Sequence, residues 1–450
     1  MSNNKGRMIR IKKISWHTFL WLNWAIILWF WWDSFSGSFA LGSANIILAL
    51  GSLAGLFAAY LILLQFFFMG RTPWIERLFG LDKLSQIHHQ AGKYGILLIL
   101  IHPLLIVWGY SRLGKISLTS QLINFISSSD DLLKAVLALS GFILVVVSSL
   151  VIVRKRLRYE SWYFVHLLAY LSVAGAYGHQ AELGTTLTSH AIFYWYWLFL
   201  YALVFSNQLI FRFLRPIYNF WKHKFFVAKI VRENYNTVSV YIGGEDLNSF
   251  NIFAGQFMIL RFFAKGLWYQ AHPFSLSLAP NGKELRVTIK QLGDFTKQIE
   301  NLKPGTRLLI DGPYGVFTDF FSLSNKVLLI AGGIGITPLR ALLEDMQKKG
   351  KDITLLYGNR EKKDIVFEQE MDNLTKQHPA RVIHVLSEEP GFTGERGYVD
   401  EEKIKRLVPD LASRDIYICG PPPMMKAIIQ TLNKLDVKSA RLHFEKFSLS

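Results

Sequence analysis

The stretch QIHHQAGKYGILLILIHPLLIVW, residues 86–108, decides the fold of this chain. It is long and apolar enough to cross a bilayer, which takes about 20 residues of helix, yet it carries His88 and His102. A second apolar stretch, residues 162–179, carries His166 and His179. Ionisable side chains at membrane depth are rare and usually face a partner or a cofactor. The two spaced pairs therefore indicate a cofactor site inside a membrane bundle.

The composition of the chain changes near residue 215. Long apolar runs precede this point, whereas the remainder mixes charged residues and glycine with short β-rich stretches. We therefore expect a cytoplasmic segment, residues 1–15, and a six-helix transmembrane bundle over residues 16–215, followed by soluble domains. The expected spans cover residues 16–32, 46–69, 86–108, 132–153, 162–179 and 191–211.

Basic residues are distributed unevenly among the expected loops. Because such residues favour the cytoplasmic side, the second and fourth loops and both termini should be cytoplasmic. The first span follows a basic segment, as in a signal peptide, but further spans follow, so we expect an uncleaved anchor. Membrane topology and anionic lipid then explain the net charge of +17 better than nucleic acid does. The basic residues concerned are Lys5, Arg7, Arg10, Lys12, Lys13, Arg71, Arg77, Lys83, Arg154, Lys155, Arg156 and Arg158.

The chain has a single cysteine, Cys419, which limits its redox chemistry. One thiol excludes an internal disulfide, a four-thiolate iron–sulfur cluster and haem attached through two thiols. The remaining redox centres are a flavin, a nicotinamide or haem ligated by histidine.

The histidine spacings favour haem. His88 and His102 are nearly four helical turns apart, so both project from almost the same face, one near each side of the membrane. Since the third and fifth spans run in the same direction, His88 should meet His166 near the cytoplasm, and His102 should meet His179 near the outer face. This pairing predicts two bis-histidine haems stacked across the membrane. The alternative is that the imidazoles bond to one another or to backbone carbonyls.

One mismatch accompanies this pairing. The spacing of His166 and His179 leaves them about 140° from a shared face on a straight helix. We expect Gly175 and Gly178 to permit a local distortion, or the two haems to be rotated relative to each other. The other histidines of the apolar half, His17, His89 and His190, are not expected to be ligands.

Residues 222–322 have the pattern of an antiparallel β-barrel, with strand signals at 225–241, 285–290 and 306–310. Within this region residues 272–277 read HPFSLS, where an aromatic ring and hydroxyls can cover an isoalloxazine ring and bond its edge. The sequence GDFT, residues 293–296, opens a short helix whose amides can hold pyrophosphate. The pattern therefore predicts a FAD domain, and the alternative is an ordinary strand and turn.

Residues 323–450 begin with a strand, a glycine loop and a helix in succession. The buried-strand run 327–331 precedes GGIGITP, residues 332–338, and an amphipathic stretch follows. This succession predicts a dinucleotide-phosphate site, although its spacing is not GxGxxG.

Further βα units in this region predict a doubly wound, α/β parallel sheet. Ligands bind at the carboxyl ends of strands in such sheets, which directs attention to the loops GNR and GPPP. The further strands are expected at residues 353–357, 381–387 and 415–419, and the two loops at 358–360 and 420–423.

The histidine pairs and the motifs HPFSLS, GGIGITP, YGNR, CGPPPMM and HFEKFSL resemble those of the ferric reductase and NADPH oxidase superfamily. Members of this superfamily are transmembrane flavocytochromes with a ferredoxin reductase-like module. The resemblance extends from about residue 16 to the end of the chain. It implies two b-type haems, FAD and NADPH as cofactors, with NADH as a possible alternative.

The resemblance also implies roles for individual residues. Phe274 would lie against the flavin ring with Ser275 near its reactive nitrogen, and Phe447 would stack on the flavin and move for hydride transfer. Many oxidases end at that aromatic residue, whereas three residues follow Phe447 here, as in soluble reductases. Ser275, Cys419 and Phe447 are the expected catalytic residues. The axial haem ligands are His88, His102, His166 and His179; the flavin contacts are His272, Pro273, Phe274, Ser275, Lys290, Gly293, Thr296 and Phe447; the nucleotide contacts are Gly332, Gly333, Gly335, Thr337, Pro338, Cys419, Gly420 and Pro421.

Arg360 bears on the choice of nucleotide. An arginine after the second strand of such a sheet can pair with a 2′-phosphate, whereas an acidic residue would favour the ribose hydroxyl of NADH. Lys362 and Lys363 lie close in sequence, so we expect NADPH. The alternative is a solvated basic loop.

The resemblance implies electron flow from NADPH through FAD and both haems to an extracellular acceptor. Since bis-histidine iron has no open position, the acceptor should react at the haem edge. Oxygen, giving superoxide, is expected first and a ferric chelate second. Animal oxidases carry a further histidine where this chain has Ile106, which argues against a dedicated oxygen site; the outer-loop carboxylates Asp130, Asp131 and Glu182 are scattered, which argues against a ferric site.

Two functions of other classes stay open. One is an electron-transfer subunit for a protein partner or a quinone, and the other is a haem-free channel whose histidines relay protons. The compact form, without a calcium-binding loop pattern, predicts a bacterial plasma-membrane protein with no obligatory protein partner.

Overall fold

The computed structural model describes residues 2–377 and 380–444, and the chain folds into two compact units. The helical unit comprises residues 10–72 and 84–212. The β-containing unit comprises residues 73–83 and the chain from Phe213 onward, together with the N-terminal residues up to Ile9. The short helix α3 (Pro73–Phe79) therefore packs with the β-containing unit, although it lies in sequence between two apolar helices.

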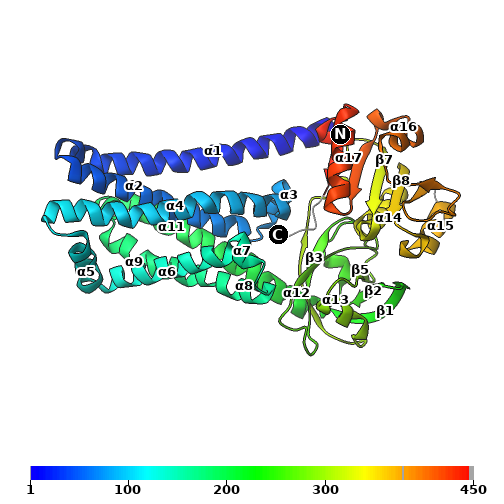
Figure 1. Ribbon diagram of the computed structural model, residues 1–450, viewed down its shortest axis with the longest axis horizontal. Coiled ribbons are helices and arrows are strands. Elements are labelled where there is room, and N and C mark those ends of the chain that lie inside the picture. Colours follow the sequence, from blue (N-terminus) through cyan, green and yellow to red (C-terminus); the bar gives the residue numbers. More distant parts are fainter. Residues whose placement is uncertain (1, 378–379, 445–450) are drawn as a thin grey trace. The chain divides into compact units, whose positions relative to one another are not determined.

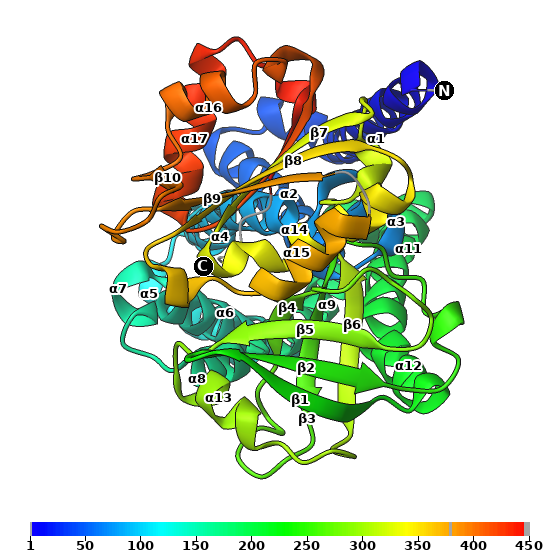
Figure 2. The same ribbon diagram turned by 90° about the vertical axis from the view of Figure 1, so that its right-hand side faces the viewer.

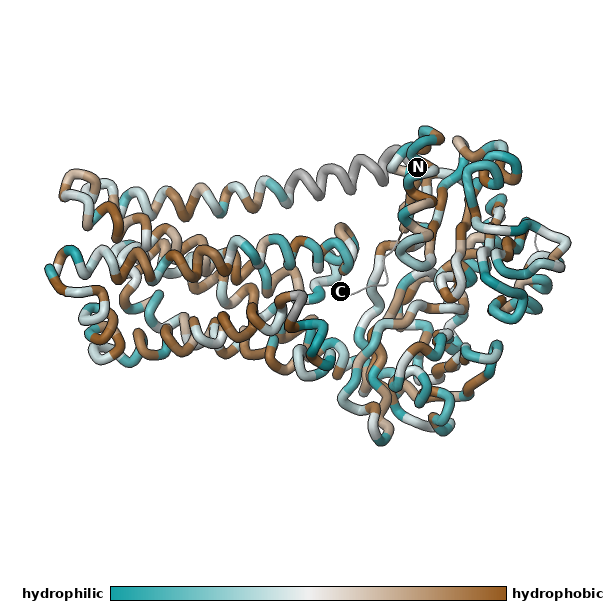
Figure 3. Tube along the Cα trace, in the orientation of Figure 1, coloured by the Kyte–Doolittle hydropathy of each residue, from teal (hydrophilic) through white to brown (hydrophobic). Residues whose placement is uncertain are grey.

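The helical unit consists of long apolar helices joined by short ones (Figures 1 and 3). Four helical runs are long and apolar enough to cross a membrane: Ser43–Met69, Leu81–Gly114, Asp130–Ser149 and Ala191–His223. Membrane localisation follows from these runs. The helices are α1 (Ser2–Phe35), α2 (Ser43–Met69), α4 (Leu81–Gly114), α5 (Leu118–Ser128), α6 (Asp130–Ser149), α7 (Val151–Arg154), α8 (Tyr159–His166), α9 (Leu168–Leu183), α10 (Thr185–Ser189) and α11 (Ala191–Asn207).

The prediction of six spans is only partly supported, because two of the expected spans do not meet the same criterion. The window 16–32 lies inside α1 and includes the polar residues His17 and Asn23, which lower its hydropathy. The window 162–179 is divided between α8 and α9, so neither helix reaches the required length by itself.

His166 and His179 lie on two helices, α8 and α9, rather than on one straight helix, so the rotation calculated for a straight helix does not apply to them. Helix α8 ends at His166, and the backbone N–H of Tyr170 bonds to the carbonyl of Leu167 at 3.0 Å in a tighter turn. The expected distortion at Gly175 and Gly178 is therefore wrong. A Cβ at Gly175 would lie 3.6 Å from Ala138 on α6, and one at Gly178 would lie 2.5 Å from a carboxylate oxygen of Asp131. Both glycines instead allow α9 to pack closely against α6.

The first part of the β-containing unit has two three-stranded antiparallel sheets, in the orders β1-β2-β5 and β4-β3-β6. Single bridges connect them, from Leu276 to Val287 and from Phe226 to Arg307. The predicted antiparallel β-barrel is thus found as two sheets around one apolar core that do not close, and the predicted strand 225–241 is a hairpin. The elements are α12 (Arg215–His223), β1 (Phe226–Asn234), β2 (Thr237–Gly243), β3 (Phe257–Phe262), β4 (His272–Ser275), β5 (Leu285–Lys290), α13 (Asp294–Gln298) and β6 (Leu308–Tyr314).

The second part is a six-stranded parallel sheet in the order β10-β9-β8-β7-β11-β12 (Figure 2). Alternate residues of its strands join two apolar clusters, one with α14 and α15 and the other with α16 and α17. Helices therefore cover both faces, as predicted. The elements are β7 (Lys326–Gly332), α14 (Ile336–Lys348), β8 (Asp352–Asn359), α15 (Glu368–Gln377), β9 (Ala380–Leu386), β10 (Glu395–Arg396), α16 (Glu401–Leu407), β11 (Asp415–Cys419), α17 (Pro422–Lys434) and β12 (Leu442–Phe444).

Candidate functional site

The four membrane histidines form the two pairs that their spacing predicts. The ring centroids of His88 and His166 lie 6.1 Å apart, and those of His102 and His179 lie 6.3 Å apart. An atom bound between two imidazole nitrogens, at about 2 Å from each and about 1 Å further to each ring centre, would separate the centroids by roughly 6 Å. Both pairs therefore have the spacing of two axial ligands on one iron.

The environment of His102 orients its ring for such a role. Its Nδ1 lies 2.8 Å from the carbonyl oxygen of Gly51 on α2, which favours a proton on Nδ1 and leaves Nε2 as the ligand atom. A Cβ at Gly55, one helical turn further along, would lie only 2.6 Å from the same Nδ1. The sequence GSLAG, residues 51–55, thus supplies both the hydrogen-bond acceptor and the space for this imidazole.

The inner pair has a different environment, built from side chains. Trp162 on α8 packs on the ring of His166 with a centroid distance of 5.1 Å and donates its indole N–H to Ser149 at 3.1 Å. The guanidinium of Arg154 lies 4.8 Å from the Trp162 ring. These contacts restrict the rotation of the His166 ring.

The remaining ring nitrogens bear on the alternative that the histidines only bond to protein groups. Nδ1 of His179 is buried without a hydrogen bond to any described residue, whereas the imidazole of His88 lies near the backbone of Gln65. Within the residues that the structure describes, no three His, Cys, Asp or Glu side chains gather as a metal site. A bare metal ion would need such a group, whereas haem supplies four ligands of its own. The donor set therefore fits haem.

The expected non-ligand histidines lie apart from both pairs. His89 is exposed, while Nε2 of His190 lies 3.1 Å from the hydroxyl of Ser34 and 3.5 Å from a carboxylate oxygen of Asp33. His190 therefore has polar partners of its own.

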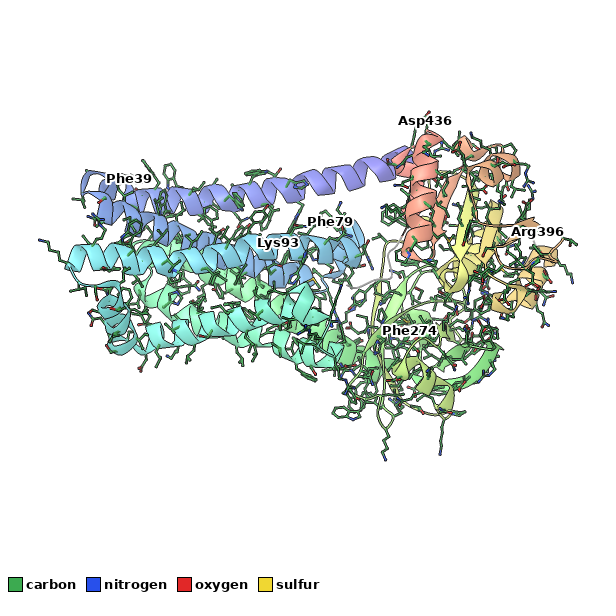
Figure 4. The ribbon with its side chains drawn as sticks, viewed as in Figure 1. Phe39, Phe79, Lys93, Phe274, Arg396 and Asp436 are labelled. Atoms are coloured by element: carbon green, nitrogen blue, oxygen red, sulfur yellow. The ribbon has the colours of Figure 1, made fainter. Side chains whose placement is uncertain are left out.

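The predicted flavin motif forms strand β4, which pairs with β3 so that Ser275 lies opposite Phe257 and Phe274 opposite Met258. Phe274 lies among the strands of this domain (Figure 4) and stacks on Phe295 at a centroid distance of 6.3 Å. His272 packs on the same Phe295 ring at 4.0 Å. Ser275 is buried. The structure thus gathers an aromatic surface at the motif.

The predicted pyrophosphate segment is shorter than a stable anion-binding helix. Helix α13 has five residues, and the Thr296 hydroxyl accepts the backbone N–H groups of Leu292 and Gly293 at 2.9 and 3.0 Å. Thr296 therefore caps its own helix in this structure. Lys290 ends β5 close by in sequence. The roles of Lys290, Gly293 and Thr296 toward pyrophosphate stay predictions.

The glycine loops of the parallel sheet meet where the strand order reverses, between β7 and β11. A Cβ at Gly335 would lie 2.3 Å from the carbonyl oxygen of Cys419, and one at Gly332 would lie 3.0 Å from Pro421. Gly333 has φ of +51°, which favours glycine. Helix α14 starts at Ile336, and the Thr337 hydroxyl bonds to the carbonyl of Ile334 at 3.1 Å. Crevices at such switch points bind nucleotides in doubly wound sheets.

Cys419 is described by the structure, whereas Phe447, another expected catalytic residue, is not. The Cys419 side chain is fully buried in an apolar cluster with Ala331 and Ile336, so its role beside the nicotinamide stays a prediction. Phe447 lies outside the described residues. His443, four residues earlier, stacks on Tyr417 at 4.3 Å and ties the last strand to the sheet.

Arg360 follows β8 and is well exposed, with 60% of its side chain accessible. Its Nε lies 3.4 Å from Oδ2 of Asp364, and the nearby carboxylates of Asp364 and Glu388 raise the pKa of its guanidinium. The arginine is therefore charged and can reach a ligand at the carboxyl edge of the sheet.

Sequence reasoning missed several residues that shape this site. Arg286 on β5 is almost wholly buried and binds both carboxylate oxygens of Glu370 on α15 at 2.5 and 3.0 Å. Glu76 on α3 is also buried and accepts the backbone N–H of Gly315 at 2.6 Å. Burial raises its pKa to about 7. Charged residues such as these are usually expected at the surface when only the sequence is known. For GSLAG, in contrast, two glycines four residues apart could have indicated close packing between helices.

Three protein-family profiles match consecutive parts of the chain. They are "Ferric reductase like transmembrane component" over residues 54–177, "FAD-binding domain" over 220–318 and "Oxidoreductase NAD-binding domain" over 329–430. The glycine betaine monooxygenase reductase subunit of Chromohalobacter salexigens is 27% identical over 50% of this chain. The chain spans 64% of the length of that relative.

Other relatives match the same soluble part. A probable dihydroorotate dehydrogenase B (NAD(+)) electron transfer subunit of Thermococcus kodakarensis is 33% identical over 39% of this chain and 67% of its own length. Among solved structures, the FAD/NAD binding domain of a nitric oxide dioxygenase from Vibrio cholerae is 26% identical, with a TM-score of 0.45 over 49% of this chain and 97% of that chain. The chain belongs to the ferric reductase and NADPH oxidase superfamily, with a membrane domain and a ferredoxin-NADP reductase-like module.

Proposed function

We propose that this protein passes electrons from NAD(P)H through FAD and two b-type haems across the plasma membrane to an extracellular acceptor. The observation that carries the proposal is the pair of opposed histidine couples, with centroids 6.1 and 6.3 Å apart, in one helical unit. A single pair of imidazoles would hold one redox centre. Two pairs at different depths in the membrane would hold two centres in succession, as electron transfer across a membrane requires.

When bound, nicotinamide, flavin and haem supply the redox chemistry, from hydride donation to single-electron transfer. His88 and His166 would hold the inner haem, and His102 and His179 the outer one. Gly51 keeps the His102 proton on Nδ1, and Trp162 fixes the plane of His166. The protein therefore contributes ligand orientation and burial rather than acid–base catalysis.

The same assignment places the other cofactors in the β-containing unit. His272, Phe274 and Ser275 would hold FAD, and the GGIGITP loop with Arg360 would hold the nucleotide, Arg360 favouring NADPH through its 2′-phosphate. NADH stays an alternative donor, since the name of one relative specifies NAD(+). Six spans with both termini in a bacterial cytoplasm are part of the same proposal.

Oxygen, giving superoxide, is the acceptor we place first. The four histidines would hold the two haems with two side chains each, and haem held in this way would supply single electrons to an acceptor that does not bind the metal. A ferric chelate can react in the same way and is the second candidate. The third is a protein or quinone, which the names of the relatives favour, because they denote a "reductase subunit" and an "electron transfer subunit".

The test is NADPH oxidation by the purified protein, loaded with haem and FAD in detergent. Cytochrome c reduction that superoxide dismutase suppresses would support the oxidase. Reduction of ferric citrate that persists without oxygen, with little dismutase-sensitive signal, would identify a ferric reductase instead. Haem that is reduced by NADPH but passes electrons to neither acceptor would favour the electron-transfer subunit. A preparation without a Soret band would contradict all three.

A further inference from the structure

The segment that follows β8 is held by residues of the flavin domain. Tyr235, in the turn between β1 and β2, donates its hydroxyl to Oδ1 of Asp364 at 2.6 Å. The neighbouring Asn234 places its amide nitrogen 3.4 Å from the backbone carbonyls of Lys363 and Asp364. The turn that carries Arg360 and Asp364 is thereby attached to a domain other than its own.

Asp364 links this attachment to Arg360. Its side chain is only 7% exposed, and Oδ2 accepts no hydrogen bond within the described residues, although it lies 3.4 Å from Nε of Arg360. Buried carboxylate oxygens need a compensating partner, and a guanidinium supplies one. With Oδ1 committed to Tyr235, the second oxygen of Asp364 faces Arg360.

The closest guanidinium atom to this carboxylate is Nε, and no hydrogen bond from Nη1 or Nη2 reaches another residue of the described chain. The terminal nitrogens of an arginine form a fork that matches the geometry of a phosphate. The nearby cations are Lys362 and Lys363, and the nearby anions besides Asp364 are Glu361, Glu368, Glu388 and Glu389. Since the surrounding charge is not positive overall, the direction in which Arg360 points decides whether it can select an anion.

We propose that Tyr235 and Asp364 are positioning residues for nucleotide selection: Tyr235 holds Asp364, and Asp364 holds Arg360 with its terminal nitrogens available to the 2′-phosphate of NADPH. The flavin domain thereby takes part in choosing the nucleotide that the neighbouring domain binds. This inference rests on the proposed role of Arg360. It assigns discrimination between NADPH and NADH to a contact between two domains.

The test compares Tyr235→Phe and Asp364→Asn with the wild type, in the full chain loaded with haem and FAD. Anaerobic reduction of the flavin is followed by stopped-flow absorbance at varied NADPH and NADH concentrations. Loss of one charge-assisted contact should raise the half-saturating NADPH concentration about tenfold. The NADH value, the limiting rate and the FAD content should stay unchanged. Tyr398→Phe, at an exposed position in the nucleotide domain, is the matched control.

Arg360→Ala distinguishes the role of Arg360 in nucleotide binding from the positioning role of Tyr235 and Asp364. If this variant weakens NADPH and NADH equally, the role of Arg360 fails and the proposal fails with it. If Arg360→Ala weakens only NADPH while Tyr235→Phe has no effect or weakens both nucleotides equally, the positioning role alone is overturned. An improvement in NADPH binding by Asp364→Asn would also overturn it, because Asp364 would then compete with the phosphate.

Discussion

Gly55→Ala tests the haem assignment without removing a ligand. The new Cβ would lie 2.6 Å from Nδ1 and 2.8 Å from Cε1 of His102, well inside van der Waals contact. Since Nδ1 is held 2.8 Å from the Gly51 carbonyl, the ring cannot move away without losing that hydrogen bond. Overpacking of this kind costs about 1–3 kcal/mol. At 1.36 kcal/mol per factor of ten, the outer haem should be retained roughly 5- to 150-fold more weakly.

The assay is the ratio of haem to FAD in the purified protein, from pyridine haemochrome spectra and released flavin. Wild type should give about two haems per FAD, and Gly55→Ala should approach one. Gly95→Ala on α4 is the matched control, because a Cβ there would meet Ile62 at 3.6 Å, an ordinary contact. If Gly55→Ala keeps both haems with an unchanged spectrum, the reasoning that places a haem at His102 is refuted.

Three further predictions follow from the same structure. His88→Ala should remove the inner haem and block its reduction by NADPH, whereas His102→Ala should leave one haem reducible; identical spectra for the two variants would contradict the order of the pairs. Glu76 has its pKa raised to about 7 by burial, so the folded state binds its proton more tightly than the unfolded state. The contribution of Glu76 to the free energy of unfolding is therefore fully present below pH 4.5, and it falls by about 3 kcal/mol as the pH rises to 7. Glu76→Gln should raise Tm at pH 7.5 but not at pH 4.5, and an equal change at both would sink the idea. Arg286→Met removes one of the two arginines that bind Glu370 and leaves Arg340, whose Nε lies 2.9 Å from Oε2. In denaturant titrations it should therefore cost less than the about 3 kcal/mol expected when a buried charge loses every partner, and a larger loss would contradict the sharing of Glu370 between two arginines.

Much of the fold could be predicted because its signals are local. Apolar runs of membrane length mark the helices, and the strand runs at 285–290 and 415–419 match β5 and β11 to the residue. The two histidine pairs follow from helical period and chain direction. The prediction of six spans is only partly supported, because a hydropathy pattern contains no information on the helix break that follows His166.

Other features depend on contacts between distant residues, which leave no period in the sequence. The barrel prediction needed correction because closure depends on pairing between strands far apart in the chain, and only single bridges join the two sheets. The buried ion pair between Arg286 and Glu370 spans two domains, and both residues resemble surface charges when read singly. Sequence reasoning found Arg360 but not Asp364, whose importance lies in what Tyr235 donates to it.

The sequence by itself determined which residues are candidates for redox chemistry: four histidines in apolar stretches, the HPFSLS motif and the GGIGITP loop, each made by residue type and local spacing. Only the tertiary structure decided how those residues are oriented. The chain breaks after His166, and His166 and His179 lie beside His88 and His102 respectively. Gly51 accepts a hydrogen bond from His102, and Gly55 leaves space for its ring. Tyr235 donates a hydrogen bond to Asp364. The physical reason is that helical and strand periods are set by neighbouring backbone bonds, whereas ring planes and ion pairs are set by packing between segments.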